Sequence, residues 1–399
     1  MNPAVSILLA YLIGSISPSY ILGKALKKID IREHGTKNAG TMNTFKILGL
    51  GPAIITAVFD LSKGLLAMSI AHLLGASPLW MHLAGFAAIA GHVFPFYLKF
   101  RGGQGVAIAT AILIYYLVTF YAKGWLPCQT LLVLAFWVLS FTYIAKIGEI
   151  VAIVVLPLLA IFILVFAPFS NYSIFILTII AYIFLIDILN ILNQKLLTFE
   201  PPPGKEEINW RLYLRPLATL LIIFYMKKDE KTSLTLVGSI VLFFLLLDLV
   251  RLFSRRINVF FFNKVKRVYK QKEYKNFSSI TIFLFAFFLT VLLFEKNIAI
   301  LAGSFLTFGD FFSKFFGIRF GRTRLFEKTF EGSLAHFNAC LISGYIFLHF
   351  ISFPLPFYAY LVGALVASIS EALPIGINDN FSVAILSAST MSVFLLFAP

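Results

Sequence analysis

Long apolar runs alternate with short polar segments along the whole chain. About fourteen of these runs approach the roughly 20 residues that a helix needs to cross a bilayer, half of them on each side of residue 205. The first run, Val5 to Leu22, follows no basic region and precedes no small-residue cleavage pattern, so we expect it to remain as a helix. The pattern predicts an all-α integral membrane protein. The composition, 60% hydrophobic and 13% charged, agrees with this.

One polar segment, EPPPGKEEINW at 200–210, divides the chain into halves of similar length. Its prolines cannot continue a helix, and its charged residues do not suit hydrocarbon. The sequence therefore predicts two polytopic helical domains of about seven spans each, residues 1–199 and 211–399, joined by the linker 200–210. We find no internal repeat between the halves, which favours a fusion over a duplication.

Positive charge is concentrated in a few loops, and the net charge is +15. Residues 251–275 hold nine Lys or Arg and one acid. Such loops could attract nucleic acid, but in a multi-span protein they more commonly face the cytoplasm and an anionic leaflet, so we expect no nucleic-acid partner. Counting spans places the polar loops of both halves on the cytoplasmic face. The exception is the mixed-charge loop 227–231, which falls on the outer face although the positive-inside rule favours the cytoplasmic face for basic loops. We expect a multi-pass protein of the cell inner membrane whose active sites face the cytoplasm.

Two polar loops of the first half are candidates for phosphate binding. HGTKNAGTMNTFK (34–46) combines neutral donors with lysines, and KFRGGQGVA (99–107) combines cations with three glycines that free the backbone. Asp60 and Lys63, three residues apart on one helix face, can neutralise each other. The expected phosphate-binding residues are Lys37, Asn43, Lys46, Lys99, Arg101, Gly102, Gly103, Gln104 and Gly105. A solvated connector and a packed histidine at His92 are the simpler alternatives.

The first 200 residues resemble the PlsY-type membrane acyltransferase family. The matching blocks are GSISPSYILGK, REHGTKNAGTMNTFKILG, DLSKG and GHVFPFYLKFRGGQGVAIATA, in family order and spacing. The resemblance implies a phospholipid-biosynthesis enzyme that transfers an acyl group from acyl phosphate to glycerol 3-phosphate, giving lysophosphatidate without a cofactor. It implies that Thr36, Asn38 and His92 act in catalysis with both phosphorylated substrates held at the glycine loop.

The chain differs from that family at several polar positions. Gln104 stands where the family has lysine, Lys46 where it usually has arginine, and Thr142 and Asp187 where it has arginine and histidine. The first half could therefore be a non-catalytic binding or anchoring module, with only the second half active. A transporter is a third possibility, although the polar residues gather at one face and not at the midplane.

Acidic and basic residues of the second half lie at the ends of apolar runs. They occur in LLLDLVRLF, LTFGDFFSK, EKTFEGSLAHF and SEALPIGINDNFS. Carboxylates on one face suit Mg²⁺ with a polyphosphate, whereas helix capping would explain any one of them alone.

These blocks resemble the dolichol, phytol and yeast-type diacylglycerol kinases, which phosphorylate lipid alcohols with CTP; a lipid cytidylyltransferase is a weaker alternative. The resemblance implies catalysis by Asp310 and Lys328, phosphate binding by Arg251, Gly332 and Ser333, and Mg²⁺ binding by Asp248, Asp310, Glu331 and Asp379. The lipid alcohol, the acyl-chain preference and the oligomeric state are open.

Overall fold

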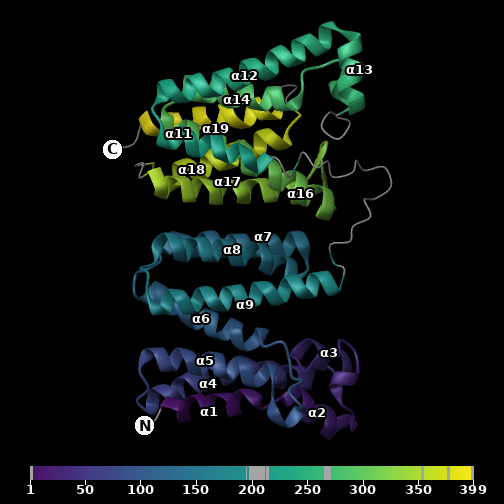
Figure 1. Ribbon diagram of the computed structural model, residues 1–399, viewed down its shortest axis with the longest axis vertical. Coiled ribbons are helices and arrows are strands. Elements are labelled where there is room, and N and C mark those ends of the chain that lie inside the picture. The colour runs from purple at the N-terminus through teal and green to yellow at the C-terminus, as the bar shows by residue number, and fades with distance from the viewer. Residues whose placement is uncertain are drawn as a thin grey trace. The chain divides into compact units, whose positions relative to one another are not determined.

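The computed structural model describes residues 3–194, 196, 212, 215–264, 271–351, 355–374 and 378–396. The chain forms two compact units, Met1–Ala135 with Ile147–Leu197, and Phe136–Lys146 with Thr198–Pro399. The described elements are helical except for one two-stranded hairpin (Figure 1). The linker predicted at 200–210 lies outside the described residues.

Antiparallel helices joined by short polar loops make up the first unit. Its elements are α1 (Pro3–Ser15), α2 (Pro18–Lys27), η1 (Ile31–Glu33), α3 (Thr41–Leu48), α4 (Leu50–Leu73), α5 (Pro78–Val93), η2 (Phe96–Leu98), α6 (Val106–Ala122), the first part of α7 (Cys128–Ala145), α8 (Gly148–Phe166) and α9 (Asn171–Asn193). Helices α1 and α5 pack closely because Gly14 and Gly91 face each other's helix. A Cβ on Gly14 would lie 2.6 Å from Cα of Ala88, so a larger residue would separate the helices.

The second unit is a helical bundle with a small hairpin at one end. Its elements are η3 (Arg215–Ala218), α11 (Thr219–Lys227), α12 (Glu230–Phe253), α13 (Arg255–Lys264), η4 (Gln271–Tyr274), α14 (Ser279–Leu293), α15 (Lys296–Ser304), the π-helical turn η5 (Phe305–Gly309), α16 (Asp310–Phe320), β1 (Arg324–Leu325), β2 (Lys328–Thr329), α17 (Phe330–Ile351), α18 (Phe357–Ala372) and α19 (Asp379–Leu396). Its core is built around fully buried Phe305 and Tyr360. Asp229 and Ser278 cap the N-termini of α12 and α14 with their side chains.

Ten helices of the described chain are long and apolar enough to cross a membrane, and three further apolar helices, α6, α14 and α18, are shorter. Large apolar side chains point outward from several of them, including Leu164 (67% exposed) on α8 and Phe243 (60% exposed) on α12. Outward apolar surface on a bundle is typical of contact with lipid. The prediction of an all-helical, multi-pass membrane protein is confirmed, and the hairpin β1–β2 is a small exception that the apolar pattern did not show.

Candidate active sites

A single asparagine organises the polar loop between η1 and α3 in the first unit. The side-chain amide of Asn43, buried on α3, donates to three carbonyl oxygens, and its oxygen accepts from the backbone N–H of Thr36 at 2.8 Å. The three carbonyls, at 2.9–3.0 Å, belong to Ile31, His34 and Asn38. Gly35 has φ +60° and lies against Asn43, so a side chain there would be strained and would clash. Asn43 thus shapes the loop, and the substrate contact predicted for it would compete with these bonds.

The glycine loop folds back onto His92 at the end of α5. The backbone N–H of Gly103 donates to the carbonyl of His92 at 3.1 Å, and that of Gly102 donates to the carbonyl of Val93 at 3.0 Å. A Cβ on Gly103 would clash with Nε2 of His92 and lie 2.7 Å from the carbonyl oxygen of Ala39. The structure therefore brings His92, the glycine loop and the loop 34–40 together, as the sequence predicted.

Behind His92 lies a buried acid–base pair on α4. Nζ of Lys63 is 2.8 Å from Oδ1 of Asp60 and 2.7 Å from Nδ1 of His92, and it donates to the carbonyl of Ile16 at 2.9 Å. Oδ1 of Asp60 is 3.6 Å from Nδ1 of His92. All three side chains are at least 95% buried. The mutual neutralisation of Asp60 and Lys63 that their spacing predicted is confirmed, and His92 is the third member of the cluster.

Arg32 links the two loops, and the sequence analysis missed it. Its Nη1 donates to the carbonyls of Leu98 and Arg101, both at 2.8 Å, at the start of the glycine loop. Asp30 holds the guanidinium through two oxygens, at 3.0 and 2.7 Å. This hydrogen bond from Arg32 is the main reason that the pKa of Asp30 is lowered. The Asp-x-Arg spacing in KIDIRE was the available signal, but a surface ion pair of this kind is common in loops.

The side chain of Gln104 pairs with α9. Its side-chain amide donates to Oδ1 of Asn190 at 2.6 Å, and Nδ2 of Asn190 donates back to Oε1 of Gln104 at 3.2 Å. The hydroxyl of Tyr182 donates to the backbone carbonyl of Gln104 at 2.6 Å. The loop is therefore fixed to α9 by a neutral pair of amides. A role for the Gln104 side chain in phosphate binding would require this pair to open.

The predicted cations of the first unit are at the surface of these loops. Lys37, Lys46, Lys99 and Arg101 are exposed, as is Thr36, while Asn38 is half-buried. Lys37 and Lys99 have φ of +57° and +56°, so each sits at a sharp backbone turn. The N–H groups of Gly102 and Gly103 are used within the loop, so the exposed cations are the groups that suit an anion here. Gly105, with φ +71°, is the N-cap residue just before α6 and makes a turn that glycine adopts most readily.

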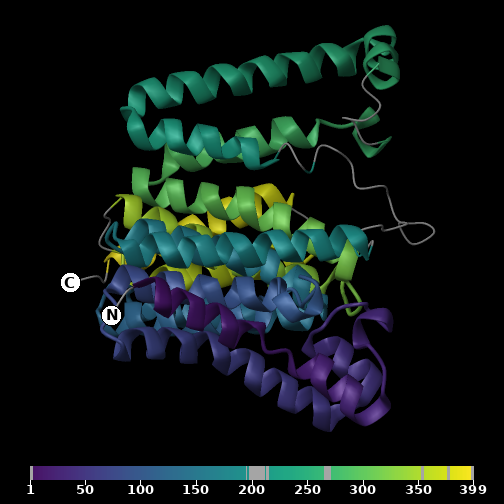
Figure 2. The same ribbon diagram turned by 60° about the horizontal axis from the view of Figure 1, so that its bottom comes forward.

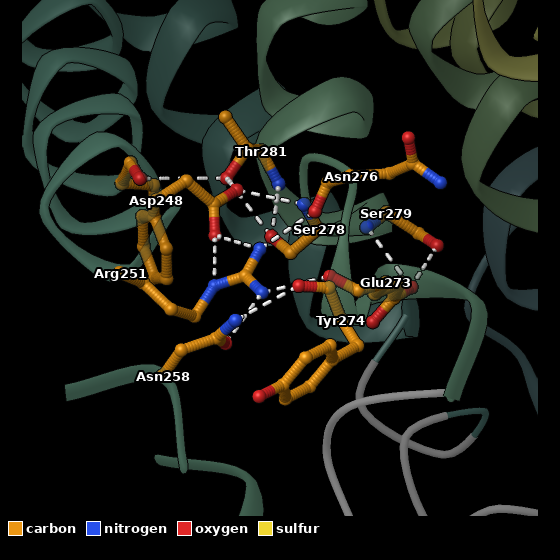
Figure 3. A network of polar contacts seen from close by, with 10 residues as sticks. Asp248, Arg251, Asn258, Glu273, Tyr274, Asn276, Ser278, Ser279 and Thr281 are labelled. Atoms are coloured by element: carbon orange, nitrogen blue, oxygen red, sulfur yellow. Dashed lines mark hydrogen bonds and ion pairs between the residues drawn. The ribbon is translucent and has the colours of Figure 1, made fainter. Parts of the chain in front are cut away.

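Asp248 and Arg251 form a saturated network in the second unit (Figure 3). The Arg251 guanidinium donates to Asp248 at 3.0 and 3.1 Å, and to three further oxygens at 2.7–3.2 Å, those of Asn258, Glu273 and Asn276. Oδ2 of Asp248 accepts from the N–H of Ser278 and the hydroxyl of Thr281, both at 2.7 Å. These acceptors account for all five N–H groups that an arginine carries. The pair ties α12 to the segment before α14, so its contacts oppose the predicted roles of Arg251 in phosphate binding and of Asp248 in metal binding.

Lys328 lies at the edge of a polar cavity of about 260 Å³ between α16, the hairpin and α17. Its Nζ is 2.6 Å from Oε1 of Glu371 and 3.1 Å from Oδ2 of Asp379. The cavity is lined by Ser313, Lys314, Gly317, Ile318, Glu327, Lys328, Thr329, Gly332 and Glu371. Gly332 and Gly317 let α17 and α16 pack closely beside it, because a Cβ on Gly332 would lie 3.1 Å from Cα of Gly317. The structure thus gathers residues from three of the four sequence blocks that were singled out in the second half.

The four carboxylates predicted to bind a metal are not gathered in one place. Glu331, fully buried, accepts from the backbone N–H groups of Arg322 and Thr323 at 3.0 and 3.1 Å and holds the hairpin. Asp310 pairs with Arg215 and, at 2.7 Å, with Lys314. Among the described residues, no group of three or more His, Cys, Asp and Glu side chains is placed to hold a metal ion. Asp248, Asp310, Glu331 and Asp379 therefore do not form one site.

Two buried residues near the cavity, Glu371 and His336, were not on the predicted list of site residues. Oε2 of Glu371 and Nε2 of His336 have no hydrogen-bond partner within the described residues. The same is true of the hydroxyl of Ser333, which was predicted as a phosphate-binding residue. Nδ1 of His336 is 2.9 Å from the hydroxyl of Ser368. Little in the sequence favours His336, since a lone histidine within an apolar helix is usually a packing residue. Buried polar atoms without partners mark a place where a ligand can bind.

Comparison with known proteins identifies relatives of the first half. The sequence profile of the family described as glycerol-3-phosphate acyltransferase matches residues 4–194. A glycerol-3-phosphate acyltransferase of Shouchella clausii (strain KSM-K16) is 49% identical over 111 residues, which are 27% of this chain and 53% of that protein. One from Bacillus velezensis (strain DSM 23117 / BGSC 10A6 / LMG 26770 / FZB42) is 46% identical over 113 residues, 28% of this chain and 58% of that protein. The chain thus spans about half the length of the curated relatives it matches.

Two solved structures also match. They are crystal structures of PlsY, an integral membrane glycerol 3-phosphate acyltransferase, in its glycerol 3-phosphate and lysophosphatidic acid forms. The first is 24% identical, with a TM-score of 0.39, and the match covers 49% of this chain and 93% of that structure. The second is 25% identical, with a TM-score of 0.37, and the match covers 50% of this chain and 93% of that structure. The resemblance drawn for the first half is confirmed by the family profile. The profile ends at residue 194, so the resemblance of the second half to lipid kinases stays a prediction.

Proposed function

We propose that residues 4–194 transfer an acyl group from acyl phosphate to glycerol 3-phosphate. The observation that supports this most strongly is the junction of the two glycine-rich loops at His92. There, the loop 34–40 and the glycine loop 102–105 meet His92 at the C-terminal end of α5, and the buried Asp60–Lys63 pair in the middle of α4 contacts His92. Within the match to the acyltransferase family, this junction combines the neutral hydrogen-bonding side chains of Thr36 and Asn38 with exposed cations, which is the chemistry that two phosphorylated substrates need.

In this proposal the protein positions two substrates that are already reactive. The glycerol hydroxyl forms a C–O bond to the acyl carbon, the bond between that carbon and the phosphate oxygen breaks, and the hydroxyl proton leaves with the phosphate. Thr36, Asn38 and His92 orient the substrates, while Lys37, Lys99 and Arg101 neutralise their charge. Positioning and anion stabilisation can supply most of the catalysis, so the reaction needs neither a side-chain nucleophile nor a cofactor. We place this chemistry at the cytoplasmic face of the inner membrane.

The test is an assay of the purified protein in lipid nanodiscs with acyl phosphate and labelled glycerol 3-phosphate. Labelled lysophosphatidate from the parent protein that disappears in Asn38→Ala would support the proposal and exclude a contaminating enzyme. Lys231→Met, an exposed change on α12, is the matched control and should keep full activity. Absence of product from the parent, with product from Gln104→Lys, would instead mean that the first half is a binding module that has lost its phosphate-binding cation.

A second activity is favoured by the polar cavity around Lys328. We propose that it holds the phosphates of CTP for transfer to a lipid alcohol. Two lysines, Lys314 and Lys328, line it together with Ser313 and Thr329. Glu371 and Asp379, which meet at Lys328, are the carboxylates that suit Mg²⁺, since this ion commonly takes one or two carboxylates with phosphate oxygens. Bound there, Mg²⁺ would neutralise phosphate charge.

In the proposed transfer, the lipid hydroxyl forms a bond to the γ-phosphorus, the bond from that phosphorus to the β-phosphate oxygen breaks, and CDP leaves. Asp310, next to Lys314, is the carboxylate expected to take the hydroxyl proton. The assay uses CTP labelled at the γ-phosphate with a prenol and, separately, diacylglycerol. Lys328→Met should lower product formation at least about 100-fold, as expected for the loss of a preorganised phosphate contact, and Lys231→Met should not. Equal rates in parent and Lys328→Met would overturn the assignment.

A further inference from the structure

A second cavity in the same unit differs from the first in its chemistry. It has a volume of about 330 Å³ and is lined mainly by apolar side chains of α12 and α14 and of η3 and α11. The lining residues are Arg215, Leu217, Ala218, Leu221, Ile240, Phe244, Ser279, Ile280, Phe283 and Leu284. Helices α12 and α14 lie side by side in both views (Figures 1 and 2). The cavity is therefore a hydrocarbon-lined space between two helices with two polar residues, Arg215 and Ser279, among its walls.

The two polar residues of this cavity, Arg215 and Ser279, are each the first residue of a helix. Arg215 begins η3 and Ser279 begins α14. Ser279 is held there by Glu273, which accepts hydrogen bonds from its N–H at 3.1 Å and from its hydroxyl. Glu273 is in turn connected through its backbone carbonyl to Arg251, so the saturated network of Figure 3 fixes the end of the cavity. An occupant would thus have its apolar part between α12 and α14 and its polar part at Arg215 and Ser279.

A short chain of charges connects the two cavities. Arg215, which lines the apolar cavity, pairs with Asp310, and Asp310 pairs at 2.7 Å with Lys314, which lines the polar cavity. Asp310 follows directly on the π-helical turn η5, and such turns often occur at functional sites. The Arg215–Asp310–Lys314 chain therefore links one lining residue of the apolar cavity to one lining residue of the polar cavity.

We propose that the apolar cavity holds the single hydrocarbon chain of a lipid alcohol, with the hydroxyl at the Arg215–Asp310 pair. This inference rests on the proposed phosphoryl transfer and names the substrate class and its binding site. A volume of about 330 Å³ is at the low end for small-molecule pockets, which suits one chain better than two. After transfer the occupant is a lipid phosphate, and the positive charge of Arg215 complements that new anion. The substrate is thus a prenol-like alcohol in preference to diacylglycerol.

The experiment uses the full-length protein in nanodiscs, with a photoreactive diazirine analogue of farnesol and no nucleotide. Crosslinked peptides from α12 and α14 are quantified by mass spectrometry. We expect labelling near Ile240 and Phe283 that excess farnesol lowers at least about fivefold and that farnesyl methyl ether does not. Equal competition by the ether, or labelling spread evenly over the outward faces of the helices, would mean ordinary bilayer lipid in the gap and would overturn the proposal.

Two neighbouring leucines on α11 provide a matched pair of variants. Leu221 lines the cavity, whereas Leu220 is 63% exposed and does not. Leu221→Trp should abolish the farnesol-sensitive labelling, and Leu220→Trp should preserve it. Arg215→Gln should preserve labelling but remove the preference for the free hydroxyl over the ether. Labelling that is equal in the two tryptophan variants would overturn the assignment of the chain to this cavity.

The labelling and the kinase assay can fail independently. Hydroxyl-dependent labelling at α12 and α14 without phosphorylation of any alcohol would retain this binding site and remove the proposed phosphoryl transfer. Phosphorylation of farnesol with labelling elsewhere would do the reverse. If both succeed, Leu221→Trp should raise KM for farnesol several-fold and leave KM for CTP unchanged, because it alters only the apolar cavity.

Discussion

The two halves of the molecule each contain a buried acid–base pair at the same spacing, and the structure uses the two pairs differently. Asp60 and Lys63 lie on α4, and Asp248 and Arg251 lie on α12. Lys63 has His92 and the carbonyl of Ile16 as further neighbours, and the cluster touches the glycine loop. Arg251 instead bonds the backbone of the segment before α14, and Asp248 closes the network.

The difference shows that a charged pair in an apolar helix does not by itself mark a functional site. A buried ion pair must satisfy its remaining donors and acceptors to offset the cost of burial. Arg251 satisfies them with backbone carbonyls of its own unit, which leaves a structural network. Lys63 has fewer backbone partners and a titratable neighbour, His92, which suits a site where substrates exchange protons and charge. The two largest of the four effects predicted below test this contrast directly, and the two smaller ones concern the loops around His92.

Arg251→Met should reduce the free energy of unfolding by about 3–5 kcal/mol, because it leaves the Asp248 carboxylate buried without its partner. Denaturant unfolding of the purified protein, followed by circular dichroism, measures this. Arg255→Met, an exposed change on α13, should have little effect. A stable Arg251→Met protein that no longer binds CTP would mean that Arg251 contacts a ligand after all.

Lys63→Met should cost less, about 1.5–3 kcal/mol as for the loss of hydrogen bonds to a charged group. The reason is that His92, 3.6 Å from Asp60, can share a proton with the carboxylate that remains. Acyl transfer should nevertheless fall below detection, because His92 loses its neighbour at 2.7 Å. The same unfolding measurement and the nanodisc assay test the two parts. Full acyl transfer by Lys63→Met would mean that the Asp60–Lys63 pair, like Asp248 and Arg251, serves only the stability of the fold.

Asn190→Leu should destabilise the first unit by about 0.5–1.5 kcal/mol, because it leaves the amide of Gln104 without its partner on α9. The loop should become more accessible, so hydrogen exchange at residues 102–105 should accelerate relative to Asn193→Leu at the end of the same helix. KM for acyl phosphate should rise with little change in kcat. Unchanged exchange in the loop would show that the Tyr182 hydrogen bond alone fixes it.

Asp30→Asn should have the smallest effect, and the effect should depend on pH. Arg32 lowers the pKa of Asp30 from its ordinary value of 3.8, so the ionised carboxylate stabilises the folded state above that pH. This contribution is lost as the pH falls through the lowered pKa of the folded protein. The parent should therefore unfold at a higher temperature than Asp30→Asn at pH 7, and the difference should shrink below pH 4. A constant difference across this range would assign the effect to packing.

Much of the first site was predictable from the sequence, and much of the second was not. The loops 34–46 and 99–107 are local motifs whose glycines and amides reveal their chemistry, and the structure brings them together at His92. The carboxylates of the second half come from separate helices. Their spacing could not show that Asp248 and Glu331 are used internally while Glu371 and Asp379 meet at Lys328. Arg32, Glu371 and His336 were not predicted as site residues because their partners also come from other parts of the chain.

The sequence by itself determined that this is a helical membrane protein, since the length and apolarity of the runs depend only on local composition and on the thickness of a bilayer. It also determined the spacing that pairs Asp60 with Lys63 and Asp248 with Arg251, because residues three apart share a helix face. Only the tertiary structure decided which buried charges are saturated, that Gln104 bonds to Asn190, and that Asp310 pairs with Arg215, a lining residue of the apolar cavity. Each of these depends on atoms brought together from distant parts of the chain, and local sequence carries no information about such partners.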